Sequence, residues 1–472
     1  MGIPSIMETG VKTIRGLAPL IKSGAVSVPK LVQDTLTRIS RLDPAINSYI
    51  TVLSESALRE GEMADKQIAE GRYLGPLHGI PIAVKDLFYI KGVRMTAGSK
   101  ILFNHIANYD STVIRRLHEA GAILLGTTNL HEFAAGATNV NPFFGAVHNP
   151  WDLTRISGGS SGGSAAAVSA GLALGALGTD TAGSVRIPAA LCGVVGLKPT
   201  YGMVSKFGVI PPEAAFDTVG VLTRCAWDAA ALFSIITGHD PLDPTSVRAE
   251  VLDFIAGVEE SFSHGRIGVP RGFFQDVIDQ RISKFFERFI TNLGRLEVAS
   301  EDVEIKDIDR AFDIWFPIHR AENAAFHAEW YPSRSSEYGE DVRRGLQSGM
   351  EVTAVQYLNA QKSRARMEKE MVETMSHLDY LALPTVAVPA PRIGEDPMRV
   401  GGKAFDVHRL LIKLTVPFNV TGFPSLSLPI GSIDGLPVGA QIVGKPFEEV
   451  KIMALANAYE EKYGLFGEPT LN

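Results

Sequence analysis

Apolar positions recur at helical spacing through the first part of the chain. Between residues 10 and 70 they fall three or four apart among polar residues, at Leu17, Leu20, Ile21, Leu31, Leu36, Ile39 and Leu42. This period is typical of amphipathic helices with one buried face. One helix is expected to end at Asp43-Pro44, because a proline disfavours helical backbone in the residue before it, and another covers residues 54–71. We predict that residues 1–75 form an N-terminal helical layer packed on the core.

From residue 76 the pattern changes to short apolar runs separated by helical segments. The runs Ile80–Val84, Ala122–Gly126 and Gly193–Leu197 predict buried strands. The segment Ser111–Ala120 predicts a helix, as does Ala165–Ala173 within a long run of small residues that reaches Gly178. Strands that alternate with helices indicate an α/β fold with a parallel or mixed sheet covered on both faces.

Residues 250 to 375 are more charged than the rest. There a strand is expected at Arg266–Pro270, and long helices at Ile278–Leu293 and Val352–Met375. Strand patterns then return at Leu381–Thr385, Leu426–Pro429 and Val438–Gly444, the last two as a closing pair. No internal repeat or low-complexity linker divides the chain, so we expect residues 76–472 to form one compact domain, with a more variable substrate-pocket region at about 250–375.

Composition limits the classes of partner. The chain has 472 residues, 45% of them hydrophobic, and a net charge of −7 without a basic block, so direct binding of nucleic acid is not expected. No apolar run reaches the roughly 18 residues of a membrane span, and the first residues lack the apolar core of a signal peptide. Two cysteines, Cys192 and Cys225, do not make a disulfide framework and read as core residues. We predict a cytoplasmic protein with no membrane partner.

Two glycine-framed serines carry the strongest chemical signal. Ser160 lies in the run Ser157–Ser164, and Ser184 ends the run Gly178–Ser184. Glycines let the backbone turn sharply and bring its N–H groups close to a ligand. A serine among such groups has what acyl transfer requires, a nucleophile beside an oxyanion hole. A lysine, Lys85, stands at the end of the predicted strand before them.

Other interpretations of these residues are weaker. Gly158-x-Ser160-x-Gly162 matches the nucleophile elbow of α/β-hydrolases, but the elbow follows a strand, and Asn149–Arg155 does not read as one. Ser27-x-x-Lys30 is more typical of a helix start. Gly171, Gly175 and Gly178 have the wrong spacing for a dinucleotide fingerprint and fit close helix packing better. His118, His131 and His148 are dispersed, so no metal site is expected.

Taken together, these blocks resemble the amidase signature family of serine hydrolases. Lys85 precedes Ser160 by 75 residues and Ser160 precedes Ser184 by 24, as the family's motifs require. Further similar words are His131–Gly136, Gly145–Trp151, Cys192–Thr200 and Pro417–Pro424, so the resemblance covers nearly the whole chain. It implies the amidase signature fold, a large mixed β-sheet with helices on both faces, and a catalytic domain over residues 76–472.

The resemblance also implies roles for individual residues. Ser184 is the expected nucleophile, Ser160 the proton relay after a cis Gly159–Ser160 bond, and Lys85 the neutral terminal base. The remaining expected site residues are listed by role: Thr181, Ala182 and Gly183, with Ser184, in the oxyanion hole; Ser161, Thr179, Asp180 and Arg186 as supports; and Ala134, Ala135 and Gly136 along the substrate. A substrate role for Arg186 stays open. No cofactor is expected.

Within the family, two activities are possible. The glutaminase A subunit of tRNA-dependent amidotransferases typically carries Asp-Gln-x-Gly-Pro, whereas Phe216–Val221 lacks that glutamine and proline, and Glu322–Gly349 resembles free-standing amidases. We therefore expect a free-standing hydrolase of small or aryl amides, with possible action on esters or carbamates, present as a monomer or homodimer. The glutaminase is the alternative. Six aromatic residues could line the pocket or belong to the core: Phe143, Phe144, Phe207, Phe216, Trp315 and Phe316.

Overall fold

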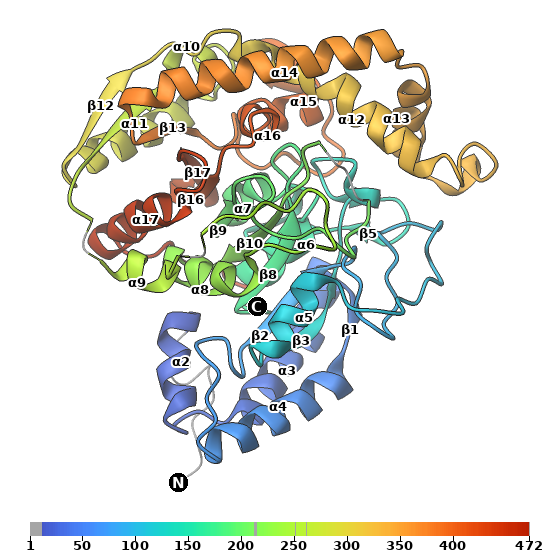
Figure 1. Ribbon diagram of the computed structural model, residues 1–472, viewed down its shortest axis with the longest axis vertical. Coiled ribbons are helices and arrows are strands. Elements are labelled where there is room, and N and C mark those ends of the chain that lie inside the picture. The colour runs from blue at the N-terminus through green and yellow to red at the C-terminus, as the bar shows by residue number, and fades with distance from the viewer. Residues whose placement is uncertain (1–11, 212–214, 251, 261, 472) are drawn as a thin grey trace.

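An 11-stranded mixed sheet forms the centre of the molecule (Figure 1). The computed structural model describes residues 12–211, 215–250, 252–260 and 262–471. In order across the sheet, the strands are β1 (Tyr49–Val52), β3 (Ile123–Thr128), β2 (Pro81–Lys85), β8 (Gly175–Thr179), β10 (Val219–Thr223), β9 (Val195–Lys198), β16 (Ser425–Ile433), β17 (Leu436–Val443), β13 (Tyr380–Pro384), β11 (Gly265–Val269) and β12 (Val298–Asp302). This is the predicted mixed α/β architecture.

The edge strand β1 is antiparallel to β3, and strand direction divides the rest of the sheet into three parts. Neighbours are parallel among β3, β2 and β8, and again among β13, β11 and β12. Between these parts, β8, β10, β9, β16, β17 and β13 are antiparallel to one another in turn. Every residue of β2, β3 and β8 is buried. Continuous burial of a strand on both faces is what a sheet covered on two sides demands, and it explains the apolar runs in the sequence.

Helices cover both faces of this sheet. On one face, α6 (Gly162–Ser169) contacts β2 and β8, and α7 (Arg186–Cys192) contacts β9, β16 and β17. On the other face, α8 (Ala226–Ile236) contacts β10 and packs with α2, α5, α9 and α17. The bounds of those four helices are α2 Ile14–Lys22, α5 Thr112–Glu119, α9 Phe254–Glu259 and α17 Glu449–Tyr463. The face that holds α6 and α7 also carries the two glycine-framed serines.

The helices near the N-terminus lie together at the lower end of Figure 1. They are α2, α3 (Val28–Ile46) and α4 (Ser54–Ala69). The region is not wholly helical as expected, because β1 pairs with β3 at the edge of the sheet. Residues 1–11 of the predicted layer lie outside the described residues, and a boundary at residue 75 stays a prediction.

Two helix boundaries differ from expectation. α3 continues through Pro44 to Ile46 and ends at Asn47, which has a left-handed backbone. A proline is tolerated there because only the carbonyl of the exposed Ser40 loses its partner. α6 stops at Ser169 instead of running on, since the left-handed Gly171 turns the chain. The small residues of Gly175–Thr179 then form a strand, not the expected helix.

A short strand also precedes Ser160, contrary to the prediction for Asn149–Arg155. β7 (Asp152–Ile156) pairs with β6 (His148–Asn149) in a separate two-stranded sheet. This strand lies outside the central sheet, whereas a nucleophile elbow directly follows a strand of the main sheet. The elbow interpretation of Ser160 is therefore still not supported. A second small sheet joins β4 (Val140–Asn141) and β5 (Gly145–Ala146).

The upper part of Figure 1 is mostly helical. It contains α10 (Arg271–Phe274), α11 (Gln280–Gly294), α12 (Ala311–His327), α13 (Glu340–Met350) and α14 (Ala354–Thr374). α15 (Val407–Ile412) and α16 (Pro417–Val420) follow a third small sheet of β14 (Met398–Val400) and β15 (Lys403–Phe405). The long helices predicted at Ile278–Leu293 and Val352–Met375 are thereby found. No helix of the described chain is long and apolar enough to cross a membrane.

The attachment of α2 to the core gives a testable expectation. The carboxylate of Asp228 in α8 accepts the backbone N–H groups of Ile14 and Arg15, at 2.9 and 2.8 Å, in the first turn of α2. We expect Asp228→Ala to lower the free energy of unfolding by about 2 kcal/mol, because one buried and one part-buried N–H group lose a charged acceptor. Chemical denaturation measures the loss.

Asp228→Asn serves as the matched control, since its amide oxygen keeps one acceptor in place. Its loss of stability should fall between those of wild type and Asp228→Ala. Equal stability of all three proteins would contradict the capping role.

Candidate active site

Lys85 ends β2 inside the protein. Its side chain is fully buried, and its ammonium nitrogen lies 2.8 Å from Oγ of Ser160 and 3.0 Å from Oγ1 of Thr179. Burial lowers the pKa of Lys85 to about 7, against the opposing charges of Asp217 and Asp180. At neutral pH a substantial fraction of Lys85 is therefore unprotonated and able to accept a proton.

Two hydrogen bonds of Ser161, one from its backbone and one from its side chain, bring the serine loops together. The Gly159–Ser160 peptide bond is cis, as the resemblance implied. The N–H of Ser161 donates to the carbonyl of Ser184 at 3.2 Å, and the hydroxyl of Ser161 donates to the carbonyl of Thr179, also at 3.2 Å. Ser161 thus ties the run before α6 to the run after β8. The structure brings Lys85, Ser160 and Ser184 into one region although they are far apart in the sequence.

The loop from Asp180 to Ser184 leaves several amides available. Within the described residues, the N–H groups of Thr181, Ala182 and Ser184 donate to no protein acceptor. The N–H of Gly183 instead donates to Oδ1 of Asp180 at 2.7 Å. Of the amides expected in the oxyanion hole, that of Gly183 is therefore already engaged in holding the loop.

Gly183 itself is required by its surroundings. Its φ is +122°, and a Cβ there would meet Oγ1 of Thr415 at 2.2 Å. That hydroxyl donates to the carbonyl of Ala182 at 2.6 Å, which orients the peptide before Gly183. Thr415 comes from the segment between α15 and α16, so a distant part of the chain sets the shape of this loop.

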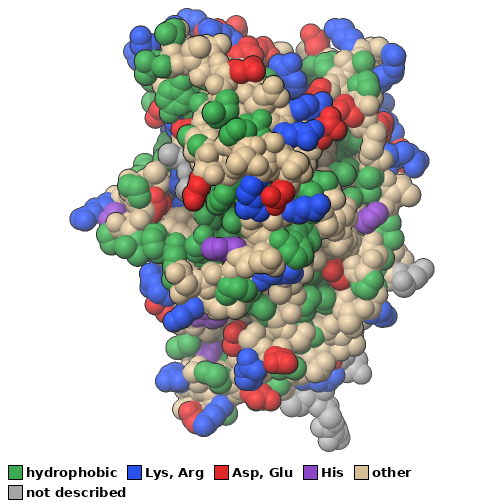
Figure 2. Space-filling view, turned by 90° about the vertical axis from the view of Figure 1, so that its right-hand side faces the viewer, with side chains coloured by type: hydrophobic (Ala, Val, Ile, Leu, Met, Phe, Trp, Pro, Cys, Tyr) green, Lys and Arg blue, Asp and Glu red, His purple; other side chains and the backbone are tan. Residues whose placement is uncertain are grey.

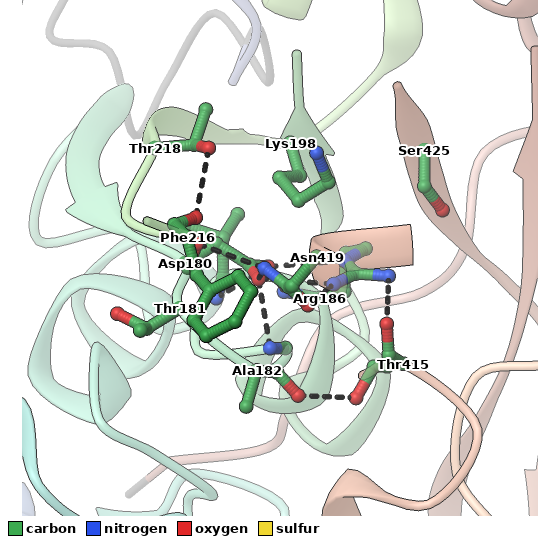
Figure 3. Close-up of polar contacts among 12 residues, drawn as sticks. Asp180, Thr181, Ala182, Arg186, Lys198, Phe216, Thr218, Thr415, Asn419 and Ser425 are labelled. Atoms are coloured by element: carbon green, nitrogen blue, oxygen red, sulfur yellow. Dashed lines mark hydrogen bonds and ion pairs between the residues drawn. The ribbon is translucent and has the colours of Figure 1, made fainter. Parts of the chain in front are cut away.

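A buried ion pair between Asp180 and Arg186 holds this loop (Figure 3). Nε and Nη2 of Arg186 donate to the two carboxylate oxygens of Asp180, at 3.0 and 2.9 Å, and neither side chain is exposed. Burial would raise the pKa of Asp180, but Arg186 outweighs it and the pKa lies well below its usual range. Asn419 adds a bond from its amide nitrogen to Oδ1 of Asp180 at 2.8 Å.

The remaining nitrogens of Arg186 are also occupied. Nη1 donates to the carbonyl of Thr415 and to Oε1 of Gln441, at 3.1 and 3.0 Å, and Nη2 reaches Oδ1 of Asn419 at 2.7 Å. A fully buried guanidinium with these partners has no donor left for a substrate. These contacts favour a supporting position for Arg186, as for Asp180, and both roles stay predictions.

A second buried lysine lies beside this pair and was not among the expected site residues. Lys198 ends β9, donates to the carbonyl of Pro199 at 2.9 Å and is fully buried. Burial, followed by the charge of Arg186, lowers the pKa of Lys198 to about 7. The sequence signal was present in the segment Cys192–Thr200, where the lysine follows an apolar run that ends at Leu197 and precedes Pro199.

A cavity with about 270 Å³ of empty space opens beside Ser184. Its walls include the three expected substrate residues, Ala134, Ala135 and Gly136, together with Thr181 and Ala182. Of the six candidate aromatic residues, Trp315 lines this cavity. Its indole N–H donates to the carbonyl of Thr181 at 3.1 Å, so it braces the loop as well.

Ala137 continues the expected segment, and three further wall residues were not singled out individually. They are His319 of α12, which falls in the expected pocket region at about 250–375, and His408 and Ile412 of α15. His319 stacks on Trp315 with 4.1 Å between ring centroids. Burial lowers the pKa of His408 to about 4, so this imidazole is neutral at pH 7. Nothing in the local sequence separates these residues from ordinary helix residues, because only tertiary packing places them at the pocket.

The wall segment His131–Gly136 is held from α13. Nε2 of His131 lies 2.7 Å from Oδ2 of Asp341, and the buried carboxyl of Glu132 accepts from Ser99 at 2.5 Å and from the N–H of Gly339 at 2.8 Å. Burial raises the pKa of Glu132 to about 7. A Cβ on Gly136 would meet the ring of His131 at 2.3 Å, so only glycine fits there.

Charge is dispersed outside the pocket. On the face shown in Figure 2, Lys and Arg side chains are interspersed with Asp and Glu. Among the described residues, no group of three or more His, Cys, Asp and Glu side chains could hold a metal ion.

The cavity beside Ser184 has unengaged amides in its wall, and a buried lysine of lowered pKa is hydrogen-bonded to the nearby Ser160. Groups of these kinds are the ones that acyl transfer uses. The profile of the Amidase family matches residues 30–453. The chain belongs to the amidase signature family, a family of hydrolases.

Individual relatives are similar over almost their full length. The A subunit of glutamyl-tRNA(Gln) amidotransferase from Coxiella burnetii (strain Dugway 5J108-111) is 36% identical, covering 96% of this chain and 97% of that protein. The solved structure of the same amidotransferase component from Thermotoga maritima has a TM-score of 0.82 and 35% identity, covering 98% of each chain. A structure from a vestigial protein complex, linked to the origins of an s-triazine catabolic enzyme, has a TM-score of 0.93 and 32% identity, covering 97% of this chain and 100% of that one.

These relatives correct two expectations. The chain was expected to be a free-standing hydrolase of small or aryl amides, with possible action on esters or carbamates, but curated relatives with 36–37% identity over almost the whole chain are A subunits of an amidotransferase. The expectation of a monomer or homodimer without a nucleic-acid partner was wrong for the same reason, because those subunits belong to an enzyme of glutamyl-tRNA(Gln). The run Phe216–Val221 led to the wrong choice between the two activities because it is only one short motif. Its Asp217 accepts a hydrogen bond from the hydroxyl of Thr181 and does not line the cavity.

The buried ion pair predicts a large effect on stability. Arg186→Met should lower the free energy of unfolding by about 3–5 kcal/mol, because Asp180 would keep its charge in the interior without its guanidinium partner. Thermal and denaturant unfolding of the purified variant measure this.

Arg59→Met, which removes an exposed guanidinium in α4, is the matched control and should change stability by less than about 1 kcal/mol. A similar small effect for Arg186→Met would contradict the anchoring role of the pair.

Proposed function

We propose that this chain is the amide-hydrolysing component of a glutamine-dependent amidotransferase. The observation that carries the proposal is Lys85, a fully buried lysine with a pKa of about 7, hydrogen-bonded to Ser160 beside the cavity of Ser184. The similarity to the A subunits of glutamyl-tRNA(Gln) amidotransferases, over almost the whole chain, supports glutamine as the source of the amide and a partner that receives the ammonia.

In this mechanism Ser184 is the nucleophile. Its hydroxyl attacks the carbon of the substrate carboxamide, and its proton passes to Ser160, whose own proton passes to Lys85. The hydroxyl of Ser184 donates to no protein acceptor among the described residues, so it is free to turn toward Ser160. When the carbon–nitrogen bond breaks, the same relay returns a proton to the leaving nitrogen, and ammonia departs.

The oxyanion that forms on the carbonyl oxygen needs N–H donors aimed at it. We assign this role to the amides of Thr181 and Ala182, with that of Ser184, because none of them is used within the protein. Gly183 fits a different role, since its amide is bound to Asp180 and holds the loop in shape. Water then attacks the acyl-enzyme by the reverse route and releases glutamate.

The cavity walls would hold the acyl part of the substrate. Ala134, Ala135 and Gly136 leave room beside Ser184 because their side chains are small, and Trp315 closes the other side. The imidazoles of His319 and His408 are polar groups on this wall, and we assign them to the polar end of the substrate. Ser161 and Thr179 keep the serine loops and Lys85 in register.

Replacement of Ser184 tests the proposal. We expect ammonia release from L-glutamine, assayed with the other amidotransferase subunits of the same organism, to fall at least about 10³-fold in Ser184→Ala, because the acyl-enzyme cannot form. Stability should be unchanged, as the hydroxyl makes no protein hydrogen bond.

Ser376→Ala, in which an exposed hydroxyl is lost, should keep full activity. Turnover of other amides by the isolated chain, with none of glutamine under any condition, would overturn glutamine as the substrate while leaving Ser184 as nucleophile.

The pH profile tests Lys85 as the base. The unprotonated amine is the active form and becomes populated above its pKa, so kcat/KM should rise through pH 7 and level off at higher pH. Lys85→Arg stays protonated and should lose about 10²–10⁴-fold in kcat.

Lys198 has a similar pKa of about 7 and could produce the same rise, so Lys198→Met is the discriminating variant. Its residual activity should keep the rise near pH 7. If kcat/KM no longer rose near pH 7 in Lys198→Met but still rose in Lys85→Arg, the titrating group would be Lys198. That result would contradict Lys85 as the base.

A further inference from the structure

A groove separate from the cavity of Ser184 lies between α12, α15 and β15. It holds about 390 Å³, which is within the usual range for small-molecule sites. Its lining comes from α10, from the turn before α12 and the first turn of that helix, and from the segment that runs from β15 into α15. No residue lines both the groove and the cavity of Ser184.

Part of the lining is apolar. It includes two aromatic residues that are partly exposed, Phe312 and Phe405, together with the core residues Phe273, Leu410 and Val416. A ligand with an apolar side chain would gain by covering the accessible part of this surface.

Most of the charged groups of the groove are engaged within the protein. Nζ of Lys413 lies 3.1 Å from Oδ1 of Asp309. Oδ1 of Asp406 accepts the backbone N–H of Arg409 at 2.7 Å and thereby caps the start of α15. Two charged groups of the lining are left, the guanidinium of Arg409 and the carboxylate of Asp313.

These two groups have opposite charges and no polar partner in the protein. Among the described residues, neither the guanidinium of Arg409 nor the carboxylate of Asp313 makes a hydrogen bond or an ion pair. The guanidinium carbon of Arg409 lies 4.3 Å from the ring centre of Phe312, and a guanidinium stacked on a ring keeps its N–H edges available. Both side chains are exposed, so a ligand in the groove can reach them.

We propose that this groove binds an α-amino acid with an apolar side chain. Its carboxylate accepts from the guanidinium of Arg409, its ammonium donates to the carboxylate of Asp313, and its side chain lies on the apolar lining. A carboxylate without an ammonium fits less well, because three aspartates and only two cations line the groove. The site goes beyond the proposed amide hydrolysis and does not depend on it.

The groove and the cavity of Ser184 share two helices. In α15, Arg409 lines the groove, whereas His408 and Ile412 line the cavity. In α12, the ring of Phe312 in the groove lies 5.8 Å from that of Trp315 in the cavity, measured between centroids. A bound amino acid would therefore contact the helices that form one wall of the cavity.

L-Leucine is the probe, with two relatives that each lack one charge. They are 4-methylpentanoate, which has no ammonium, and 3-methylbutan-1-amine, which has no carboxylate. Titration calorimetry on the full chain should give saturable binding of one L-leucine. Each relative should bind at least about tenfold more weakly, because one charged group of the groove is then left without its partner.

Two variants test which residue recognises which charge. Asp313→Asn should weaken L-leucine binding about tenfold, to the level of 4-methylpentanoate, and leave that acid unaffected or more tightly bound. Arg409→Gln should weaken L-leucine binding to the level of the amine and leave the amine unaffected. Glu340→Gln and Arg344→Gln, which remove an exposed pair of charges in α13, are the matched controls and should bind L-leucine as the wild type does.

A third variant locates the ligand without removing a charge. Ala404 lines the groove from β15 and is exposed, so Ala404→Trp fills the space with little effect on folding and should abolish L-leucine binding. Non-saturating binding of L-leucine to the wild type would overturn the proposal. So would equal affinity of the wild type for L-leucine and 4-methylpentanoate, or wild-type affinity in Ala404→Trp.

Discussion

The ion pair between Asp180 and Arg186 is the constraint on which the candidate site depends. It is completely buried, and its two residues flank the loop that ends in Ser184. The cost of removing two charges from water is offset only when every remaining donor and acceptor is satisfied. Here Asn419, Gln441 and Thr415 supply those partners from beyond residue 410. The C-terminal strands and helices are thus required for the conformation of a loop that precedes them by more than 200 residues.

The same constraint explains the direction of the backbone amides. Asp180 accepts the N–H of Gly183, which leaves the amides of Thr181 and Ala182 directed elsewhere and unused. Donors that are fixed before a substrate arrives need not reorganise when charge develops on it, which is the main source of electrostatic catalysis. Burial also tunes Lys85. Because β2 is buried on both faces, the charged form of Lys85 is costly and its pKa is lowered.

Much of the central sheet and of the loops could be predicted, because local patterns encode them. Apolar runs identified β2, β3, β9, β11 and β13, and glycine-rich words identified Ser160 and Ser184. The end of α3 and the strand at Gly175–Thr179 were missed, since proline position and small-residue packing depend on neighbours. His319, His408 and Ile412 were missed for a stronger reason: helices far along the chain bring them to the cavity. The prediction of a free-standing hydrolase was wrong because it relied on one short motif, Phe216–Val221, whereas similarity over the whole chain indicates an amidotransferase subunit.

The separate origin of the cavity walls affects how such a protein can diverge. The loops with Lys85, Ser160 and Ser184 come from residues 85–184, whereas His319, His408 and Ile412 come from α12 and α15. Mutations in those two helices can alter what the cavity admits without disturbing the buried ion pair. Trp315 is the exception, because its indole also holds the carbonyl of Thr181. In a lineage that acquires new substrates, we expect this tryptophan to be inherited while its neighbours in α12 vary.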